Sequence, residues 1–402
     1  MKKLLLFSLL TVSASAATNS LTLDRALALT AKYNPQLAVA VANWNAAEQR
    51  AIQAGKRLNP NLILGTENTP LNGTSAAKGD YRAGISQSIR LNGTAKLNRR
   101  IATAESERAA LLHSAAANQI RQAVHSAFAS ALFAQANERL FTERIRLLET
   151  NAALVKLLVS NGESVSEASE VAHAELDHEQ LEHRESLALR KKAFAQLASA
   201  IGQPELNIPS VAGQLRTELG LARIEAAAKE LNELPTVLAQ DTSTEIMKLR
   251  AQLARASRVP NLNLGLVYRR VQSNRRDALD IQTSIALPIF DNKRAAAKAF
   301  EADARAAEAQ SRLQRQQLEL QYRRNLTDLR ISLNRANHIR DEILPHKERA
   351  LRRREALFQA GESSRLEFTQ AQLAYTEERR HHLDTLREVH RYWAALQRFV
   401  SD

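Results

Sequence analysis

The sequence repeats itself once, at an offset of about half its length. The segment 60–65 (PNLILG) recurs at 260–265 (PNLNLG), an offset of 260 − 60 = 200 residues. The segment 161–164 (NGES) recurs at 360–363 (AGES), an offset of 361 − 162 = 199 residues between the two glycines. Two matches at nearly one offset indicate a duplicated unit that is far longer than the repeats of common solenoid proteins. The chain must therefore fold from two related halves.

The start of the chain has the form of a secretory signal peptide. Lys2 and Lys3 precede an apolar stretch from Leu4 to Leu10 and the small residues 14–16, so we expect residues 1–16 to be removed. The formal net charge of +13 alone would permit a nucleic-acid partner. Because secretion directs the chain to the cell envelope, we expect no such partner. The sequence has no Cys, so we expect neither disulfides nor a lipoprotein-type anchor.

Four segments alternate apolar and polar residues as β-strands do. No stretch after residue 16 approaches the roughly 18 to 20 apolar residues of a membrane-spanning helix, whereas each segment has about the length of a tilted membrane strand. Two soluble hairpins would be the simpler interpretation for either pair alone, but a pair at both duplicated positions favours membrane strands. We predict strands at about 60–69, 81–91, 261–270 and 280–289. Their predicted lipid-facing side chains are those of Leu62, Leu64, Ile85, Ile89, Leu264, Leu266, Ile285 and Leu287.

Four strands cannot close a barrel. An open sheet edge in lipid would leave backbone amide and carbonyl groups unpaired, at a cost of several kcal/mol each. We therefore expect the chain to share its barrel with copies of itself, and three copies would supply about twelve strands.

The remainder of each half is predicted to be a hairpin of very long helices. Aromatic residues make up only 4% of the chain, and helix-forming residues fill about 93–160 and 291–359 almost without a breaker. At 1.5 Å per residue, each stretch would be on the order of 100 Å long. Each ends at a glycine, Gly162 or Gly361, suited to the left-handed conformation that terminates helices, and a return helix follows.

Each half should also begin with a helix that leads into its first strand. These helices are predicted at about 22–58 and 217–259, and we expect Pro345 to kink the second long helix.

The fold class is therefore mainly α with a small transmembrane β part. The first repeat is predicted to span 17–202, with its helical hairpin at about 93–201. The second repeat is predicted to span 218–402, with its helical hairpin at about 291–400. Residues 203–217 contain Pro204, Pro209 and Gly213 and should form an equatorial connector between the repeats.

The second half carries the sequence pattern of a known family. Its motifs resemble, in order and spacing, the final helical hairpin of the TolC-like outer-membrane efflux factors. These motifs are 343–345 (ILP), 350–351 (AL), 356–358 (ALF), 361–363 (GES), 366–367 (LE) and 371–372 (AQ). The first half repeats the pattern more loosely at 161–164, and 89–93 and 287–291 match the family's strand-to-helix corners. The lack of Cys and of a segment after the last helix is similar to the shorter, cation-efflux type of member.

The resemblance implies a homotrimer. Its twelve-strand barrel would lie in the outer membrane of a Gram-negative bacterium and continue into a helical barrel in the periplasm. The trimer would be the passive exit duct of a tripartite efflux system, with a periplasmic adaptor (membrane fusion) protein and a proton-driven inner-membrane pump as partners. Glu367 and Gln370 would line the periplasmic gate, although the family more often has Asp at the position of Glu367. The residues that would meet the adaptor are Asn161, Gly162, Glu163, Gly361, Glu362 and Ser363.

A row of histidines suggests metal chemistry, but its spacing argues against a site. His178 and His183 are five residues apart, about 140° around a helix, so they cannot share one metal ion as an i, i+4 pair would. We expect His173, His178 and His183 to be a polar row, with a transient metal path as the alternative. No nucleophile–base arrangement, phosphate loop or carboxylate pair stands out, so we expect no enzymatic activity, cofactor or bound metal.

Two arginine runs are the other charged feature. Segments 352–354 and 379–380 are expected to be charged helix faces balanced by nearby glutamates. Pairing between subunits or contact with an adaptor is the functional alternative. For the whole chain, the alternative to an exit duct is a soluble periplasmic coiled-coil adaptor or scaffold protein, which would leave the strand pairs without a purpose.

Overall fold

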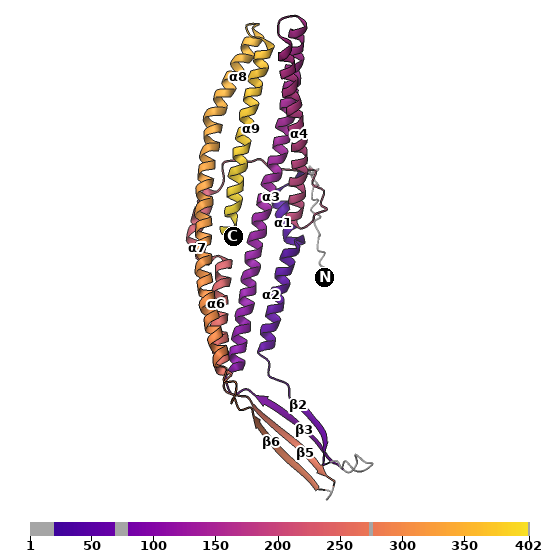
Figure 1. Ribbon diagram of the computed structural model, residues 1–402, viewed down its shortest axis with the longest axis vertical. Coiled ribbons are helices and arrows are strands. Elements are labelled where there is room, and N and C mark those ends of the chain that lie inside the picture. The colour runs from indigo at the N-terminus through magenta and orange to yellow at the C-terminus, as the bar shows by residue number, and fades with distance from the viewer. Residues whose placement is uncertain (1–19, 69–78, 273–275, 401–402) are drawn as a thin grey trace, which may run out of the picture. The chain divides into compact units, whose positions relative to one another are not determined.

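The computed structural model of the chain describes residues 20–68, 79–272 and 276–400 (Figure 1). The predicted signal peptide, residues 1–16, lies outside the described residues, as do Pro70 and Arg275 in the two predicted hairpin loops.

Two units make up the described chain, and both halves of the sequence contribute to each. The first unit combines the residues up to 35 with 118–228 and 321–402. The second combines 36–117 with 229–320. The sequence repeat and the packing unit are therefore different divisions of the chain.

Long helices dominate the chain, as expected from its helix-forming stretches. Helix α3 (Thr94–Ser160) has 67 residues, and α4 (Ser166–Ile201) runs back beside it. The second predicted long helix is interrupted where Pro345 was expected to disturb it. Helix α7 (Arg294–His338) passes through a π-helical turn, η3 (Ile339–Ile343), into α8 (Leu344–Gln359), and α9 (Arg365–Leu396) returns. A π turn accommodates one extra residue per turn, so it changes which side chains share a face before and after it.

The helices that precede the strands are broken, which corrects the prediction of two continuous helices at 22–58 and 217–259. Asn34 (φ −70°, ψ 118°) and Leu234 (φ −58°, ψ 135°) have extended ψ because each precedes a proline. Pro35 and Pro235 are themselves 235 − 35 = 200 residues apart, so the breaks are duplicated too. In the first half the resulting helices are α1 (Leu23–Tyr33) and α2 (Pro35–Ala54). In the second half they are α5 (Leu221–Ala226), the 3-10 helix η2 (Ala227–Glu233) and α6 (Pro235–Ala256). A separate short 3-10 helix, η4 (Gln397–Phe399), follows α9.

The second unit contains a four-stranded antiparallel sheet of order β2-β3-β5-β6 (Figure 1). Its strands are β2 (Asn61–Glu67), β3 (Asp80–Ile89), β5 (Leu262–Val271) and β6 (Arg276–Ile285). Within the described residues, β2 and β6 each pair along one side only, so the sheet has two open edges.

Strand β6 begins and ends earlier than the predicted 280–289. Its charged first residues were expected in a loop, but they pair across the sheet: Tyr268 Oη donates to Asp277 at 2.8 Å, and Arg269 Nε donates to Asp280 at 2.9 Å. These contacts extend the hairpin ladder. Leu287, predicted to face lipid from this strand, consequently lies beyond its end at Ile285.

The strand register gathers the apolar side chains on one face of the sheet. One row across it is Leu62, Ile85, Leu266 and Ile281, with exposed fractions of 70, 56, 44 and 78%. Seven of the eight predicted lipid-facing residues lie on this face, and all seven are exposed. The opposite face carries Glu67, Arg82, Arg269 and Asp280.

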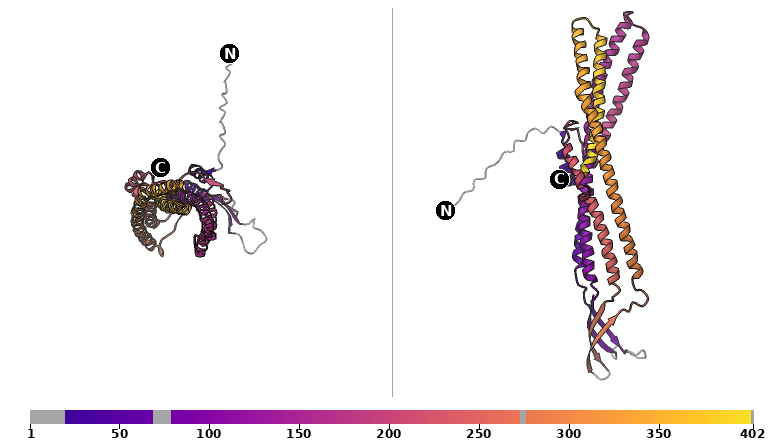
Figure 2. Two further views of the ribbon diagram at one scale, coloured as in Figure 1. Left: turned by 90° about the horizontal axis from the view of Figure 1, so that it is seen from above. Right: turned by 90° about the vertical axis from the view of Figure 1, so that its left-hand side faces the viewer.

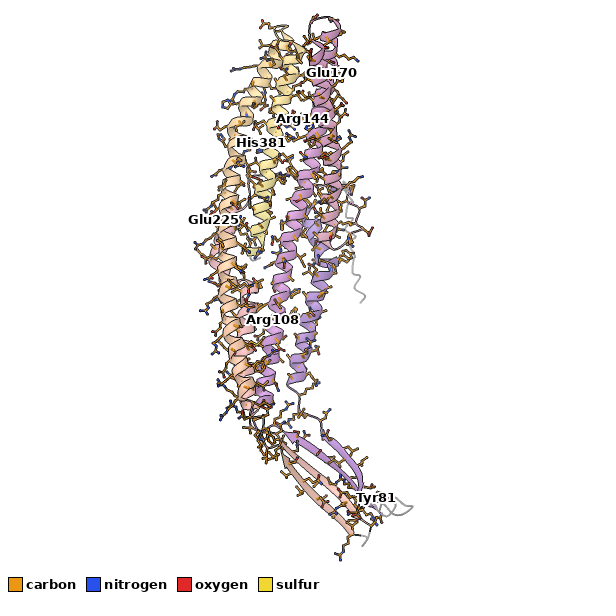
Figure 3. The ribbon with its side chains drawn as sticks, viewed as in Figure 1. Tyr81, Arg108, Arg144, Glu170, Glu225 and His381 are labelled. Carbon is orange, nitrogen blue, oxygen red and sulfur yellow. The ribbon has the colours of Figure 1, made fainter. Side chains whose placement is uncertain are left out.

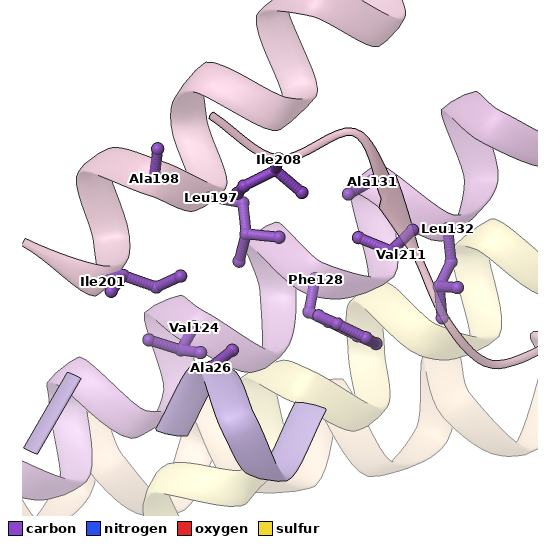
Figure 4. Close-up of a cluster of buried hydrophobic side chains, with 10 residues drawn as sticks. All are labelled: Ala26, Val124, Phe128, Ala131, Leu132, Leu197, Ala198, Ile201, Ile208 and Val211. Carbon is purple, nitrogen blue, oxygen red and sulfur yellow. The ribbon is translucent and has the colours of Figure 1, made fainter. Parts of the chain in front are cut away.

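The first unit packs around a cluster that joins helices to the connector between the repeats (Figure 4). Strand β1 (Ser20–Leu21) pairs in parallel with β4 (Ser210–Val211), and the Gln135 side chain both donates to and accepts from the Val211 backbone at 3.0 Å. The buried members of the cluster are Ala26, Val124, Phe128, Ala131, Leu132, Leu197, Ala198, Ile201, Ile208 and Val211. In the second unit, α3 and α6 pack through Ile101, Ala104, Ile246 and Leu249.

Candidate functional site

Two turns, which join α3 to α4 and α8 to α9, have the same backbone geometry. Gly162 and Gly361 both have a φ of +77°, and no heavy atom lies within 4 Å of a Cβ placed on either. In each turn the residue after the glycine donates a backbone hydrogen bond to a carbonyl five residues earlier: Glu163 to Leu158 at 2.9 Å, and Glu362 to Leu357 at 2.8 Å. This is the Schellman ending of a helix, which requires a left-handed residue. Asn161, Gly162, Glu163, Gly361 and Glu362 are exposed, and Ser363 is half-buried.

The second turn is followed by a fully capped helix. The Ser364 hydroxyl accepts from the Glu367 amide at 3.2 Å, and the Glu367 carboxylate accepts from the Ser364 amide at 3.1 Å. The Ser363 hydroxyl also donates to Glu367 at 2.7 Å, and Arg354 of α8 lies 3.4 Å from it. These contacts, the Ser363 hydrogen bond foremost, lower the pKa of Glu367 below its usual value. The predicted gate carboxylate therefore also caps α9, and the exposed Gln370 lies one turn further on the same face.

The first turn lacks these capping groups. Val165 occupies the N-cap position of α4, and no side chain caps that helix end. At the duplicated position Ala168 stands where α9 has Glu367. The two turns are thus alike in backbone and different in side-chain chemistry.

An ion-pair cluster that was not predicted joins α3, α4 and α9 below the turns. Arg144 of α3, labelled in Figure 3, donates through Nε to Glu179 of α4 at 2.8 Å and through Nη1 to Glu377 of α9 at 2.7 Å. The side chains of Arg144 and Glu179 are only 14 and 8% exposed. Breaking a desolvated pair of this kind is costly, because removal of one partner leaves the other charge buried and uncompensated.

The second arginine run contributes to the same cluster. Arg379 contacts both carboxylate oxygens of Glu143 on α3, at 2.7 and 2.8 Å. Arg380 donates to Glu377 at 2.8 Å and lies 3.5 Å from Glu182 of α4. The run was expected to be balanced on its own helix, and Arg380 with Glu377 fits that expectation. Arg379 does not, because its partner lies on another helix.

The three histidines of the predicted polar row have separate surroundings. His173 Nδ1 lies 2.7 Å from the Ser169 carbonyl oxygen, and His178 lies 3.6 Å from Glu182. His183 is half-buried, with its ring centroid 6.5 Å from that of Phe141.

A cavity of about 830 Å³, with both polar and apolar lining residues, lies where the strands meet the helices of the second unit. It opens beside the strand ends on the polar face of the sheet, and the predicted corner residues Arg90, Asn92, Pro288 and Phe290 line it. The Asn92 side chain fixes this corner by donating to the Val259 carbonyl at 2.6 Å and by accepting from the Thr94 amide at 3.1 Å. None of the helices in the described part of the chain combines the length and apolar character that crossing a membrane requires.

Comparison with known proteins agrees with this architecture. A family model described as "Outer membrane efflux protein" matches residues 227–400. The cobalt-zinc-cadmium resistance protein CzcC of Cupriavidus metallidurans is 25% identical over 398 residues, which cover 98% of this chain and 93% of CzcC.

Solved structures share the fold at low sequence identity. The outer membrane protein VceC of Vibrio cholerae superposes with a TM-score of 0.73 at 18% identity, covering 94% of this chain and 95% of VceC. The outer-membrane channel OprN superposes with the same TM-score of 0.73 at 18% identity, covering 94% of this chain and 89% of OprN.

Proposed function

We propose that this chain is a member of the outer membrane efflux protein family, whose model matches residues 227–400, and that it forms the exit duct of a tripartite efflux system. In this role the protein supplies a passive path and a gate, without a catalytic step. Its partners would be a periplasmic adaptor and a proton-driven inner-membrane pump, and it would lie in the outer membrane of a Gram-negative bacterium and extend into the periplasm.

The sheet is the observation that carries this proposal. Its apolar face is exposed from β2 to β6, as a surface that meets lipid would be, while the other face is polar. Among the strands that the structure describes, β2 and β6 each pair along one side only, and an open sheet edge of this kind is costly in lipid. Three copies joined edge to edge would close a barrel of about twelve strands and satisfy both requirements.

The turns would be the periplasmic ends of the duct. Asn161, Gly162 and Glu163 in one turn, and Gly361, Glu362 and Ser363 in the other, would meet the adaptor. Glu367 and Gln370 would line the gate, where carboxylates from three copies would favour cations over anions.

The exported substrate is proposed to be a divalent metal cation. The support is the likeness to CzcC, a cobalt-zinc-cadmium resistance protein, together with the carboxylate at the gate. A strain that lacks the gene should be more sensitive to cobalt, zinc or cadmium, and expression of the chain should restore its resistance. Unchanged metal tolerance with increased sensitivity to organic toxins would contradict this substrate class.

Fractionation and electrophoresis test the duct itself. The protein should be recovered with outer membranes and should migrate as a trimer that heating converts to monomer. Recovery in the soluble periplasm would overturn the proposal and favour the adaptor or scaffold alternative.

Single-channel recordings test the gate with a matched pair of variants. Glu367→Gln removes the charge but can still cap α9, because Gln also serves in capping boxes. Glu367→Ala removes both the charge and the side chain that caps α9. If Glu367 sets ion preference, both variants should lose cation selectivity in a planar bilayer, and unchanged selectivity in Glu367→Gln would exclude the carboxylate from the gate.

A further inference from the structure

The outer face of α4 is acidic, and the side chains of this face, from Glu167 to Leu181, are exposed in the described part of the chain. Within the first unit the helices lie in the order α8, α9, α3, α4, so that α4 and α8 are outermost (Figures 1 and 2). Helix α4 buries Ala172, Glu179, Ser186 and Ala193, which recur every seven residues. The opposite face, which we name the α4 seam, consists of Glu167, Glu170, Ala174, Asp177 and Leu181, all of them exposed. Figure 3 labels Glu170 on this helix.

The spacing of the α4 seam is that of a helix–helix contact. Its members follow one another at intervals of three and four residues, the pattern that keeps one stripe of a helix against a neighbour. Leu181 is 49% exposed, and Val171 beside the seam is 58% exposed. A face with this spacing and with exposed apolar side chains is suited to a partner helix.

Helix α8 has a matching face of opposite charge. Its side chains toward α9 include Phe358, whose ring stacks on Phe368 with centroids 5.5 Å apart. The opposite face, which we name the α8 seam, consists of His346, Arg349, Arg353 and Ala356, again at intervals of three and four residues and all exposed. No residue of α8 is buried.

The charges of both seams have no opposite partner among the described residues. In the part of the chain that the structure describes, Glu167, Glu170 and Asp177 form no ion pair, and neither do Arg349 and Arg353. Arg349 Nη2 lies 2.9 Å from His346 Nδ1, and His346 supplies no negative charge. By contrast, Arg352 and Arg354, which lie off the seam, pair with Glu348 and Glu367.

We propose that the α4 seam of one copy of this chain packs antiparallel against the α8 seam of the next copy, so that acidic and basic rows join neighbouring subunits. This inference rests on the proposed oligomeric duct and deepens it by naming the interface. The residue numbers give the register. Glu170 lies eight residues after Gly162 and Arg353 lies eight residues before Gly361. The two turns lie at the same end of the first unit (Figures 1 and 2). The equal residue counts from the two glycines therefore predict that Glu170 and Arg353 lie at the same height along the helices.

The same register matches the other seam residues. Ala174 and Arg349 are each twelve residues from the glycine of their own turn, and Asp177 and His346 are each fifteen. Asp177 would therefore lie within one turn of both His346 and Arg349. Since α4 runs away from its turn and α8 runs toward its own, the contact is antiparallel in any ring that has all turns at one end. A second copy is the occupant that offers both complementary rows at matched height, and the two open sheet edges independently require neighbouring copies.

Cysteine cross-linking tests the register directly, because the native sequence has no Cys. The variant Glu170→Cys with Arg353→Cys, purified without adaptor and oxidised, should give covalent dimers and trimers on a denaturing gel. The matched control is Glu175→Cys with Arg353→Cys, because Glu175 is exposed on the same helix but points away from the seam. The control should stay monomeric on the same gel.

The outcomes separate this proposal from the proposed function. Equal cross-linking of both variants, or none in a preparation that light scattering identifies as trimeric, would overturn the interface and leave the duct intact. A monomeric native protein would instead overturn the oligomeric duct.

Charge exchange supplies a second test. Glu170→Arg with Asp177→Arg should lower the temperature at which the trimer dissociates, and Arg349→Glu with Arg353→Glu should do the same. A variant with all four substitutions should regain most of the wild-type dissociation temperature, because the charges are then exchanged between the two seams. Added salt should reduce the difference in dissociation temperature between wild-type and either double variant. Circular dichroism checks that each variant is folded. If both double variants keep the wild-type dissociation temperature but lose binding to a purified adaptor, the two seams bind the adaptor and the proposed subunit interface is wrong.

Discussion

Gly84 on β3 and Val267 on β5 lie directly opposite each other, and the valine fills the space that a side chain at position 84 would need. A Cβ on Gly84 would lie 2.7 Å from Val267 Cγ2 and 2.4 Å from the Leu266 carbonyl oxygen. Val267 is only 1% exposed, so the side chain has little room to move away. This contact joins the first predicted hairpin to the second.

Gly84→Ala should therefore weaken the sheet where the two hairpins meet. Overpacking of this kind costs about 1–3 kcal/mol, and the affected atoms include backbone, which cannot rotate aside. Gly265→Ala is the control, because the nearest atom to its Cβ, Gln282 Cβ, is at an ordinary 3.5 Å. Chemical unfolding in detergent should separate the two variants, and an equal effect of both would contradict the role given to Val267.

The buried ion pair below the turns predicts unequal effects of two arginine substitutions. Arg144→Ala leaves the buried Glu179 unpaired and should cost about 3–5 kcal/mol of unfolding free energy. Arg379→Ala breaks a pair whose side chains are 37 and 45% exposed and should cost less than about 1 kcal/mol. The measurement is chemical denaturation of both variants beside wild-type. If the two variants lost similar amounts of unfolding free energy, burial of the Arg144–Glu179 pair would not explain the cost of the Arg144 substitution.

The turn glycines should tolerate no side chain, although space is free around them. At a φ of +77°, an L-residue costs about 1–2 kcal/mol, so Gly162→Ala and Gly361→Ala should each destabilise the protein by that amount. Gly220→Ala is the control that separates backbone strain from steric crowding. A Cβ on Gly220 would also have no heavy atom within 4 Å, but the φ of Gly220 is −59°. It should leave the unfolding free energy nearly unchanged. A loss equal to that of the turn variants would show that the effect is not conformational.

The capping role of Glu367 predicts a dependence on pH. Its pKa is lower in the folded protein than in the unfolded chain, chiefly because the Ser363 hydroxyl donates to the carboxylate. The stabilisation is therefore present above about pH 4.5 and is lost as the pH falls through the folded-state pKa. Glu367→Gln, which does not titrate, should lose less stability than wild-type between pH 6 and pH 3. Parallel stability curves for the two proteins would contradict the assignment.

His125 predicts a second, separate pH effect. Burial is the main cause that lowers its pKa to about 4, and its ring packs edge-on against Trp393 with centroids 5.2 Å apart. The unfolded chain binds a proton near pH 6.5 and the folded protein only near pH 4, so stability should fall as the pH is lowered between these values and level off below them. His125→Phe keeps an aromatic contact and should remove this part of the slope. The measurement is the unfolding midpoint of wild-type and His125→Phe from pH 7 to pH 4, and equal slopes for the two proteins would contradict the prediction.

Local chemistry explains which features could be predicted from the sequence. Gly162 and Gly361 were recognisable because only glycine adopts their conformation freely. The strands were recognisable because alternating apolar and polar residues lie on opposite faces of a sheet. The capping box was equally local: Ser364 and Glu367 have the required spacing of three residues. The breaks before Pro35 and Pro235 also had a visible signal, since a residue that precedes proline avoids the helical conformation.

The missed features depend on residues far apart in the chain. Arg144 pairs with Glu377, which is 233 positions away, and no periodicity along one helix predicts such a contact. The early start of β6 has the same origin. Asp277 and Asp280 are typical of a loop, and only partners on β5 make them suitable for a strand.

The interleaving of the two units has a consequence for how the protein is made. Residues 36–117 cannot complete their unit until residues 229–320 have also been synthesised, and the other unit likewise needs both ends of the chain. Until then, the exposed apolar row of the first hairpin, including Leu62 and Ile85, lacks its neighbouring strand β5. The two hairpins of the sheet therefore cannot fold one after the other as independent units, and the sheet forms only once both halves of the chain are present.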